Sequence, residues 1–306
     1  MLARLTSILG VLALLVAVYA LVIRPAQLHW GATADELART MPEDDIVAHP
    51  AFDATRAITI HGRPEEIWPW LAQMGYGRAG FYGYDLIENP GGGAGIRSAQ
   101  TILPAYQNPK TGDLLPLSVA ATLVYGSIKK NSYIVWRSRD VPSDGVYIWE
   151  LVPIDANHTR LISRIRWSYL HSAQGMALGL LTEVGDHVAV RAILRGICDR
   201  VEGRVLSPLW MQGAEIIAWL LAVGELILAA VFGMRWSRWW RAWLLALGAG
   251  LMLLFLLYGP QPVWISAPLP WLYLVLIVWV LRAECVRNDR VFAGLGPKPN
   301  HRPFSK

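Results

Sequence analysis

The chain has 306 residues, of which 54% are hydrophobic and 17% are charged, whereas an ordinary soluble domain has about 25% charged residues. Residues 24–213 carry 18 basic and 19 acidic side chains, so the net charge of +5 comes from the flanking segments, with 10 basic and 4 acidic ones. This composition excludes a simple soluble protein, a disordered chain and a disulfide-rich module, and the basic excess gives no indication of nucleic-acid binding.

Four apolar segments are predicted to be transmembrane helices: 5–23, 214–234, 242–259 and 263–281. A helix of about 20 residues spans roughly 30 Å, the thickness of a bilayer core. When these helices are threaded in order, the basic flanks (Arg4, the 235–241 loop and the tail) fall on one side, which the positive-inside rule makes cytoplasmic. We therefore expect a multi-pass cell-membrane protein whose residues 24–213 lie on the non-cytoplasmic side. The first segment is expected to remain as a signal anchor, with cleavage as the alternative.

The pattern divides the chain into five parts. We expect the signal anchor at 1–23, a polar lead-in exposed to solvent at 24–50, a folded domain at 51–206, a three-helix membrane region at 207–281 and a basic cytoplasmic tail at 282–306.

Within the folded domain, alternating or strand-like runs occur at 55–61, 113–117, 121–127, 132–138, 146–151 and 160–168. A helix is predicted to begin at Pro64, because Ile67, Trp70, Leu71 and Met74 follow at helical spacing. The last strand is expected to be half-buried, with a basic outer face.

A long amphipathic helix is predicted at about 174–202. Its apolar stripe, expected to face the sheet, contains Leu178, Leu181, Val184, Val188, Ala192 and Arg195, broadened by Ile193 and Ile197. The segregation of strands and helices favours an α+β domain, with an antiparallel sheet and a helix on one face.

The segment 55–92, TRAITIHGRPEEIWPWLAQMGYGRAGFYGYDLIENPGG, resembles the START-related SRPBCC superfamily of polyketide cyclases, aromatases, lipid-transfer proteins and birch-pollen-allergen-like proteins, in particular membrane-attached bacterial members. Gly112-Asp113, TRLISRIR at 159–166 and ILRGICDRVEG at 193–203 also fit, so the resemblance covers about 29–204. It implies a helix-grip fold, in which a curved antiparallel sheet surrounds a long C-terminal helix and a hydrophobic cavity. Gly83 stands where such motifs often have serine.

A polar and aromatic cluster follows the first domain helix: Arg78, Tyr82, Tyr84, Asp85, Glu88 and Asn89. One interpretation is structural, with Arg78 paired to Asp85 or Glu88. The other places the cluster at the mouth of a cavity, where it orients a ligand head group.

Tryptophans supply further candidates for a cavity wall: Trp68, Trp70, Trp136, Trp149 and Trp167. Ordinary core packing is the alternative. In the second membrane segment, Glu225 is expected to face the helix bundle and bond a polar group or backbone atom, either as packing or in a proton or ligand role.

No catalytic motif, metal-ligand spacing or cofactor fingerprint occurs, and Cys198 and Cys285 are expected on opposite sides of the membrane. The leading hypothesis is a membrane-anchored START-like domain that binds a lipid or other hydrophobic small molecule near the bilayer. The alternatives are a cyclase or aromatase acting on an apolar substrate, and a structural or partner-binding module with a vestigial cavity. An acid/base pair inside the cavity would favour an enzyme, and a filled core would favour the vestigial module.

Overall fold

The chain divides into two compact units, Met1–Gln212 and Gly213–Lys306. The computed structural model describes these residues: 17–89, 97–139, 144–168, 172–235, 239–258 and 263–293. Most of the apolar segment expected at 5–23, the glycine-rich stretch at 91–95, and parts of the basic loop and tail lie outside the described residues.

The first unit is built on one antiparallel sheet of six strands in the order β1-β6-β5-β4-β3-β2. The strands are β1 (Phe52–His61), β2 (Leu114–Pro116), β3 (Thr122–Lys129), β4 (Tyr133–Ser138), β5 (Gly145–Pro153) and β6 (His158–Trp167). All six predicted strands are confirmed within a few residues at their ends. The first and last strands pair along their whole length, from Phe52 opposite Trp167 to His61 opposite His158.

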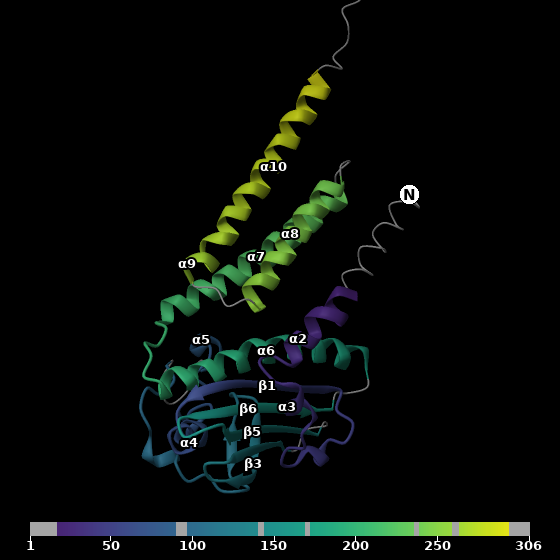
Figure 1. The fold of residues 1–306 in the computed structure, drawn as a ribbon. Helices are drawn as coiled ribbons and strands as arrows, with labels where there is room; N and C mark the ends of the chain where they lie inside the picture. The colour runs from purple at the N-terminus through teal and green to yellow at the C-terminus, as the bar shows by residue number, and fades with distance from the viewer. Residues whose placement is uncertain are drawn as a thin grey trace, which may run out of the picture. The chain divides into compact units, whose positions relative to one another are not determined.

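Two helices contribute most of the packing on the inner face of this sheet. The first, α4 (Pro64–Gln73), begins at the predicted proline, and the long helix α6 (Ala173–Val201) runs across the sheet (Figure 1). The shorter helices are η1 (Tyr19–Ile23), α2 (Arg24–Leu28), α3 (Ala34–Ala38), η2 (Asp44–Ile46), α5 (Asp85–Glu88) and η3 (Pro104–Tyr106). The α+β class and the helix on one face are therefore confirmed.

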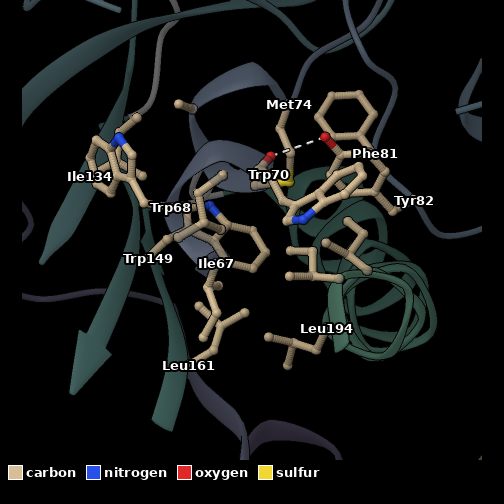
Figure 2. Close-up of a cluster of buried hydrophobic side chains, with 14 of the residues drawn as sticks. Ile67, Trp68, Trp70, Met74, Phe81, Tyr82, Ile134, Trp149, Leu161 and Leu194 are labelled. Carbon is tan, nitrogen blue, oxygen red and sulfur yellow. Dashed lines mark hydrogen bonds between the residues drawn. The ribbon is translucent and has the colours of Figure 1, made fainter. Parts of the chain in front are cut away.

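The inner face carries the largest cluster of buried apolar side chains. Trp149 and Leu161 come from the strands, Ile67 and Trp68 from α4, and Leu194 from α6 (Figure 2). At about 25 cal/mol for each Å² of buried apolar surface, such a cluster is the main source of stability in the unit.

The outer face of the sheet is covered as well, which corrects the expectation of a solvent-exposed lead-in at 24–50. Met41 and Val47 pack on Val135, Ile148 and Ile162 of the outer face. The lead-in remains rich in acidic residues because these neutralise the basic side chains of β6.

Two ion pairs join the lead-in to β6. Arg164, 4% exposed, donates to Asp44 Oδ2 at 2.7 Å, and Arg160 donates to Glu36 Oε1 at 2.7 Å. The basic face of β6 is therefore an internal layer of paired charges.

The buried stripe of α6 agrees with the predicted one only in its C-terminal part. Val188, Ile193 and Ile197 are buried as predicted, but Leu178 and Leu181 are exposed, and Val190, Leu194 and Cys198 are buried as well. The apolar pattern alone missed this because the N-terminal half of α6 buries polar side chains against α2 and β1.

That polar interface centres on Arg56 of β1, which is 1% exposed. Its guanidinium pairs with Asp186 of α6 at 2.5 Å and donates to the carbonyl oxygen of Gln27 in α2 at 2.9 Å. Beside it, Arg24 of α2 forms two hydrogen bonds to the buried carboxylate of Glu183, at 2.7 and 2.8 Å. Two ion pairs therefore fix the N-terminal half of α6.

The second unit contains α7 (Leu209–Arg235, which starts in the first unit), α8 (Trp239–Tyr258), α9 (Val263–Ser266) and α10 (Pro268–Ala293). Among the described residues, one stretch, Leu209–Ala229, is long and apolar enough to cross a membrane, and Trp243–Tyr258 and Pro268–Val280 are shorter apolar helices, so the four predicted transmembrane helices stay a prediction. Helices α8 and α10 meet where Tyr273 Oη donates to the Leu245 carbonyl at 2.8 Å.

We predict that Arg56→Met lowers the free energy of unfolding by about 3–5 kcal/mol, because the charge of Asp186 is left buried without its partner. Urea unfolding of the full-length protein in detergent measures this change. Arg63→Met is the matched control, since Arg63 pairs with Glu66 on the surface, where such pairs contribute about 1 kcal/mol or less. Equal effects of the two substitutions would contradict the structural role of Arg56.

Candidate functional site

A cavity of about 290 Å³ lies between α6 and the inner face of the sheet, and we call it the α6 cavity. Strands β4 and β5, helices α5 and α6, and the segments after α4 and β2 supply its wall. The lining residues are Tyr76, Phe81, Ile87, Glu88, Leu117, Ser118, Val119, Trp136, Tyr147, Trp149, Asp186, Ala189, Val190 and Ile193. Ile87 and Val119 are exposed, so the cavity reaches the surface beside them.

Three aromatic side chains form one wall of the α6 cavity. The ring centroid of Trp136 lies 5.4 Å from that of Trp149, and Tyr147 stacks on Trp149 with centroids 6.1 Å apart. They meet because β4 and β5 are neighbouring strands, with Trp136 directly opposite Tyr147. The indole N–H groups of Trp136 and Trp149 are buried without a hydrogen-bond partner in the described chain.

Two carboxyl groups, from Glu88 and Asp186, line this otherwise apolar wall. Asp186 is the partner of Arg56 described above. Burial raises the pKa of Asp186, and the Arg56 guanidinium opposes that rise. An ion pair at hydrogen-bond distance keeps this carboxylate ionised and balanced in charge.

Among the described residues, Glu88 has no such cation beside it. Its Oε2 accepts a hydrogen bond from the Gly83 backbone N–H at 3.2 Å, while its Oε1 is buried without a partner in the described chain. Burial raises the pKa of Glu88 to about 7, and the nearby charge of Asp85 adds to the rise. A carboxyl group that is half protonated near neutral pH can donate or accept a proton.

Glycine at position 83 is explained by this contact. A Cβ atom there would lie 2.5 Å from Glu88 Oε1, so a side chain at position 83 would displace the carboxyl group. Glycine at this position therefore leaves room for Glu88.

The predicted pairing of Arg78 with Asp85 or Glu88 is wrong. Arg78 lies over the ring of Tyr106, 4.6 Å from its centroid, and donates to the Ala72 carbonyl at 3.0 Å. The glycine turn after α4 directs this side chain toward β3, away from α5.

Three predicted site residues belong to a structural network beside the cavity. Asp85 Oδ1 accepts hydrogen bonds from the backbone N–H and the hydroxyl of Ser98, at 3.1 and 2.6 Å, and from the Asn89 amide at 3.1 Å. Tyr82 is buried, with its hydroxyl donating to the Trp70 carbonyl at 3.0 Å (Figure 2), and burial raises the pKa of Tyr82. Ser98, absent from the predicted set, completes the network.

The other candidates take separate positions. The Tyr84 carbonyl accepts the backbone N–H groups of Ile87 and Glu88 at the start of α5. Trp68 and Trp70 are buried in the inner core, and Trp167 is half-buried against Gly145. Of the eleven candidates named from the sequence, Glu88, Trp136 and Trp149 line the α6 cavity. The structure adds Asp186 and Tyr147, which are brought there by α6 and by the pairing of β4 with β5.

Cys198 and His187 are buried outside the cavity lining. Burial raises the pKa of the Cys198 thiol to about 12, and its Sγ lies 3.2 Å from Glu202 Oε1. Burial lowers the pKa of His187 to about 3, with the charges of Arg56 and Arg191 adding to the effect. Within the described residues, no three His, Cys, Asp or Glu side chains are placed to hold a metal ion.

Glu225 in α7 is 2% exposed, as expected for a side chain that faces other helices. The expectation that it bonds a polar group is wrong for the described residues, because both carboxyl oxygens lack a hydrogen-bond partner. It lines a small apolar pocket of about 270 Å³ with residues of α7 and Leu274 of α10.

Comparison with known proteins gives low similarities. No protein-family model matches the chain, and neither does a curated protein. Among solved structures, an aromatase/cyclase from Streptomyces sp. R1128 is 13% identical, with a TM-score of 0.33 over 49% of this chain and 93% of its own. A Thermobifida fusca protein is 15% identical, with a TM-score of 0.32 over 50% and 97%, and a Mesorhizobium loti protein is 16% identical, with a TM-score of 0.30 over 50% and 100%. These values assign no activity to the chain.

We predict that Glu88→Gln stabilises the protein increasingly as the pH rises. The folded wild type holds the Glu88 proton up to a pH of about 7, whereas the unfolded chain releases it near 4.5. The free energy of unfolding of the wild type therefore falls as the pH rises from about 4.5 through 7, whereas that of the variant does not. Its advantage should be near zero at pH 4.5 and reach about 1–3 kcal/mol at pH 8, after discounting for partial exposure.

Urea unfolding at several pH values measures this advantage, and Glu65→Gln, on the exposed side of α4, is the control. An advantage of Glu88→Gln that stays constant from pH 4.5 to 8 would contradict the raised pKa.

Proposed function

We propose that residues 51–206 form a membrane-tethered, START-like module that binds a lipid or other hydrophobic small molecule in the α6 cavity. The observation that carries this proposal is the cavity itself, with aromatic and aliphatic side chains over most of its wall and an exposed apolar mouth at Ile87 and Val119. Such a wall favours an apolar molecule by roughly 25 cal/mol for each Å² buried.

The volume of the cavity limits the size of the ligand that it can hold. A cavity of about 150 Å³ holds one benzene ring, so about 290 Å³ suits a molecule of two rings or a short acyl segment. A whole phospholipid is too large, so a lipid ligand would insert one end. This space also argues against a vestigial module with a filled core.

The arrangement of elements supports the START-like assignment. The helix-grip fold implied by the resemblance at 55–92 requires an antiparallel sheet, a long C-terminal helix and a cavity between them. In this chain β1 pairs with β6, α6 follows β6 in the sequence, and the cavity lies between α6 and strands β4 and β5.

Membrane attachment is part of the proposal. The Leu209–Ala229 stretch of α7 is long enough to cross a bilayer, and large apolar side chains of α8 and α10, including Leu251, Trp271 and Val275, are more than half exposed. Exposed apolar surface on this scale is expected to contact lipid. We propose four spanning helices with both termini in the cytoplasm, which keeps the binding module near the outer bilayer surface.

An enzyme of the cyclase or aromatase type is the second candidate. It is favoured by one observation: Glu88, whose pKa is raised to about 7 by burial, shares the cavity wall with Asp186, which is paired with Arg56. Paired carboxyl groups with different protonation states can serve as acid and base.

We predict that Ala189→Phe weakens uptake of the neutral probe N-phenyl-1-naphthylamine at least tenfold, because the added ring occupies the cavity. Full-length protein in lipid nanodiscs is titrated, and the probe's fluorescence is measured against protein-free nanodiscs. Leu181→Phe is the control, since Leu181 lies on the same helix and is exposed. Equal loss in both variants, or no saturable signal in the wild type, would count against the cavity as the binding site.

We predict that a cysteine at Asn157 reacts with a membrane-impermeant maleimide in intact cells, whereas a cysteine at Asn300 does not. Cys285 is first replaced by serine, and Cys198 is buried. Asn157 is exposed in the turn before β6, and Asn300, outside the described residues, belongs to the basic tail. The reverse labelling pattern would show that the proposed orientation is wrong.

A further inference from the structure

The charged residues described in the wall of the α6 cavity are all acidic. Two acidic residues, Glu88 and Asp186, line it, and none of the described lining residues is basic. Arg56, which is not a lining residue, balances the charge of Asp186, with Nη1 lying 2.5 Å from Asp186 Oδ2. The uncompensated charge of the wall is therefore negative whenever Glu88 is ionised.

The buried Glu88 Oε1 atom needs a hydrogen-bond donor. Within the described chain this oxygen has none, while the backbone N–H groups of Gly83, 3.2 Å from Oε2, and of Tyr84 lie beside the carboxylate and stabilise its charge. Leaving a buried carboxylate oxygen without a hydrogen-bond donor is unfavourable, because its lost hydration is not replaced. A ligand that brings a donor to Oε1 recovers this free energy, and a cationic donor also restores the charge balance.

The aromatic residues favour the same kind of ligand. Five of the lining residues have aromatic rings: Tyr76, Phe81, Trp136, Tyr147 and Trp149. The face of an aromatic ring attracts a cation, and the attraction is stronger when the cation is desolvated. Aromatic rings around a carboxylate suit an organic ammonium group better than they suit a neutral head group.

We propose that the α6 cavity selects an apolar molecule with a protonated amine, whose ammonium group donates to Glu88 while its hydrocarbon part packs against Trp136, Tyr147 and Trp149. This inference rests on the proposed function and names the ligand class of the same site. A fatty acid or another anion is disfavoured, because its carboxylate would meet Glu88 and Asp186 with no basic lining residue among those described.

One feature of the wall favours a different ligand. The unpartnered indole N–H groups of Trp136 and Trp149 are neutral donors that could bind the oxygen of an alcohol or ketone. A ligand chosen by these groups would be neutral and would not depend on Glu88. A matched series of probes separates the two.

The experiment uses 1-naphthylmethylamine, 1-naphthylmethanol and 1-naphthoate, which share one bicyclic body and differ in charge. Each is equilibrated by dialysis against full-length protein in uncharged lipid nanodiscs, and nanodiscs with the Ala189→Phe variant measure partitioning into lipid. We expect the amine to bind at least tenfold more tightly than the alcohol at pH 8, and the anion to bind most weakly. In Glu88→Gln the amine should lose most of this advantage, leaving a ratio below about threefold.

The ratio of amine to alcohol affinity should also rise between pH 6 and 8, as Glu88 loses its proton. The other ionisable groups near Glu88 are Asp85 beside it and, across the cavity, Asp186 with its partner Arg56 and the two tyrosine hydroxyls of the wall. Glu88→Gln removes the pH dependence if Glu88 is its source. A pH dependence that persists in Glu88→Gln would overturn the assignment to Glu88.

The results distinguish a failure of the proposed selectivity from a failure of the proposed function. Tighter binding of the alcohol or the anion, or equal binding of all three probes, overturns the proposed selectivity while the cavity remains a binding site. An amine preference that is unchanged in Glu88→Gln also overturns it. No binding above the Ala189→Phe level for any probe overturns the proposed function itself.

Discussion

The buried guanidinium of Arg56 is the interaction on which the first unit depends most. It comes from the edge strand β1, pairs with Asp186 of α6 and donates to the backbone of α2, so one side chain joins three elements that are far apart in the sequence. An arginine buried to this degree is stable only with such partners, because an unpaired buried charge is very costly. The pair fixes the N-terminal half of α6 over the sheet.

The same pair shapes the cavity. Fixing α6 places Asp186, Ala189 and Val190 on one wall, opposite the aromatic side chains of β4 and β5. Because Arg56 already neutralises Asp186, the second acidic group, Glu88, is left as the one without a described cation. The two carboxylates therefore differ in their surroundings: Asp186 has a guanidinium partner, whereas Glu88 Oε1 has no hydrogen-bond partner among the described residues.

The sequence predicted the six strands, α4 and α6 because each has local periodicity or a local stop signal, such as Pro64 or Asp144-Gly145. It misplaced the buried stripe of α6 because Glu183 and His187 are polar yet buried, and their partners lie more than 150 residues away. The solvent-exposed lead-in was wrong for the same reason: Asp44 is acidic but meets Arg164 of β6. Glu88, Trp136 and Trp149 of the cavity wall were predicted. Asp186 was not, because its position is set by the pair with Arg56, and no local pattern indicates that long-range pair.

The central claim is that the α6 cavity holds an apolar ligand when the protein is in its native membrane. Mass spectrometry of small molecules extracted from the purified full-length protein tests it most directly, with Ala189→Phe purified in parallel. The account predicts a molecule with an amine group and an apolar part of about two rings or a short chain, enriched in the wild type and depleted in the variant. Identical extracts from both proteins would contradict it.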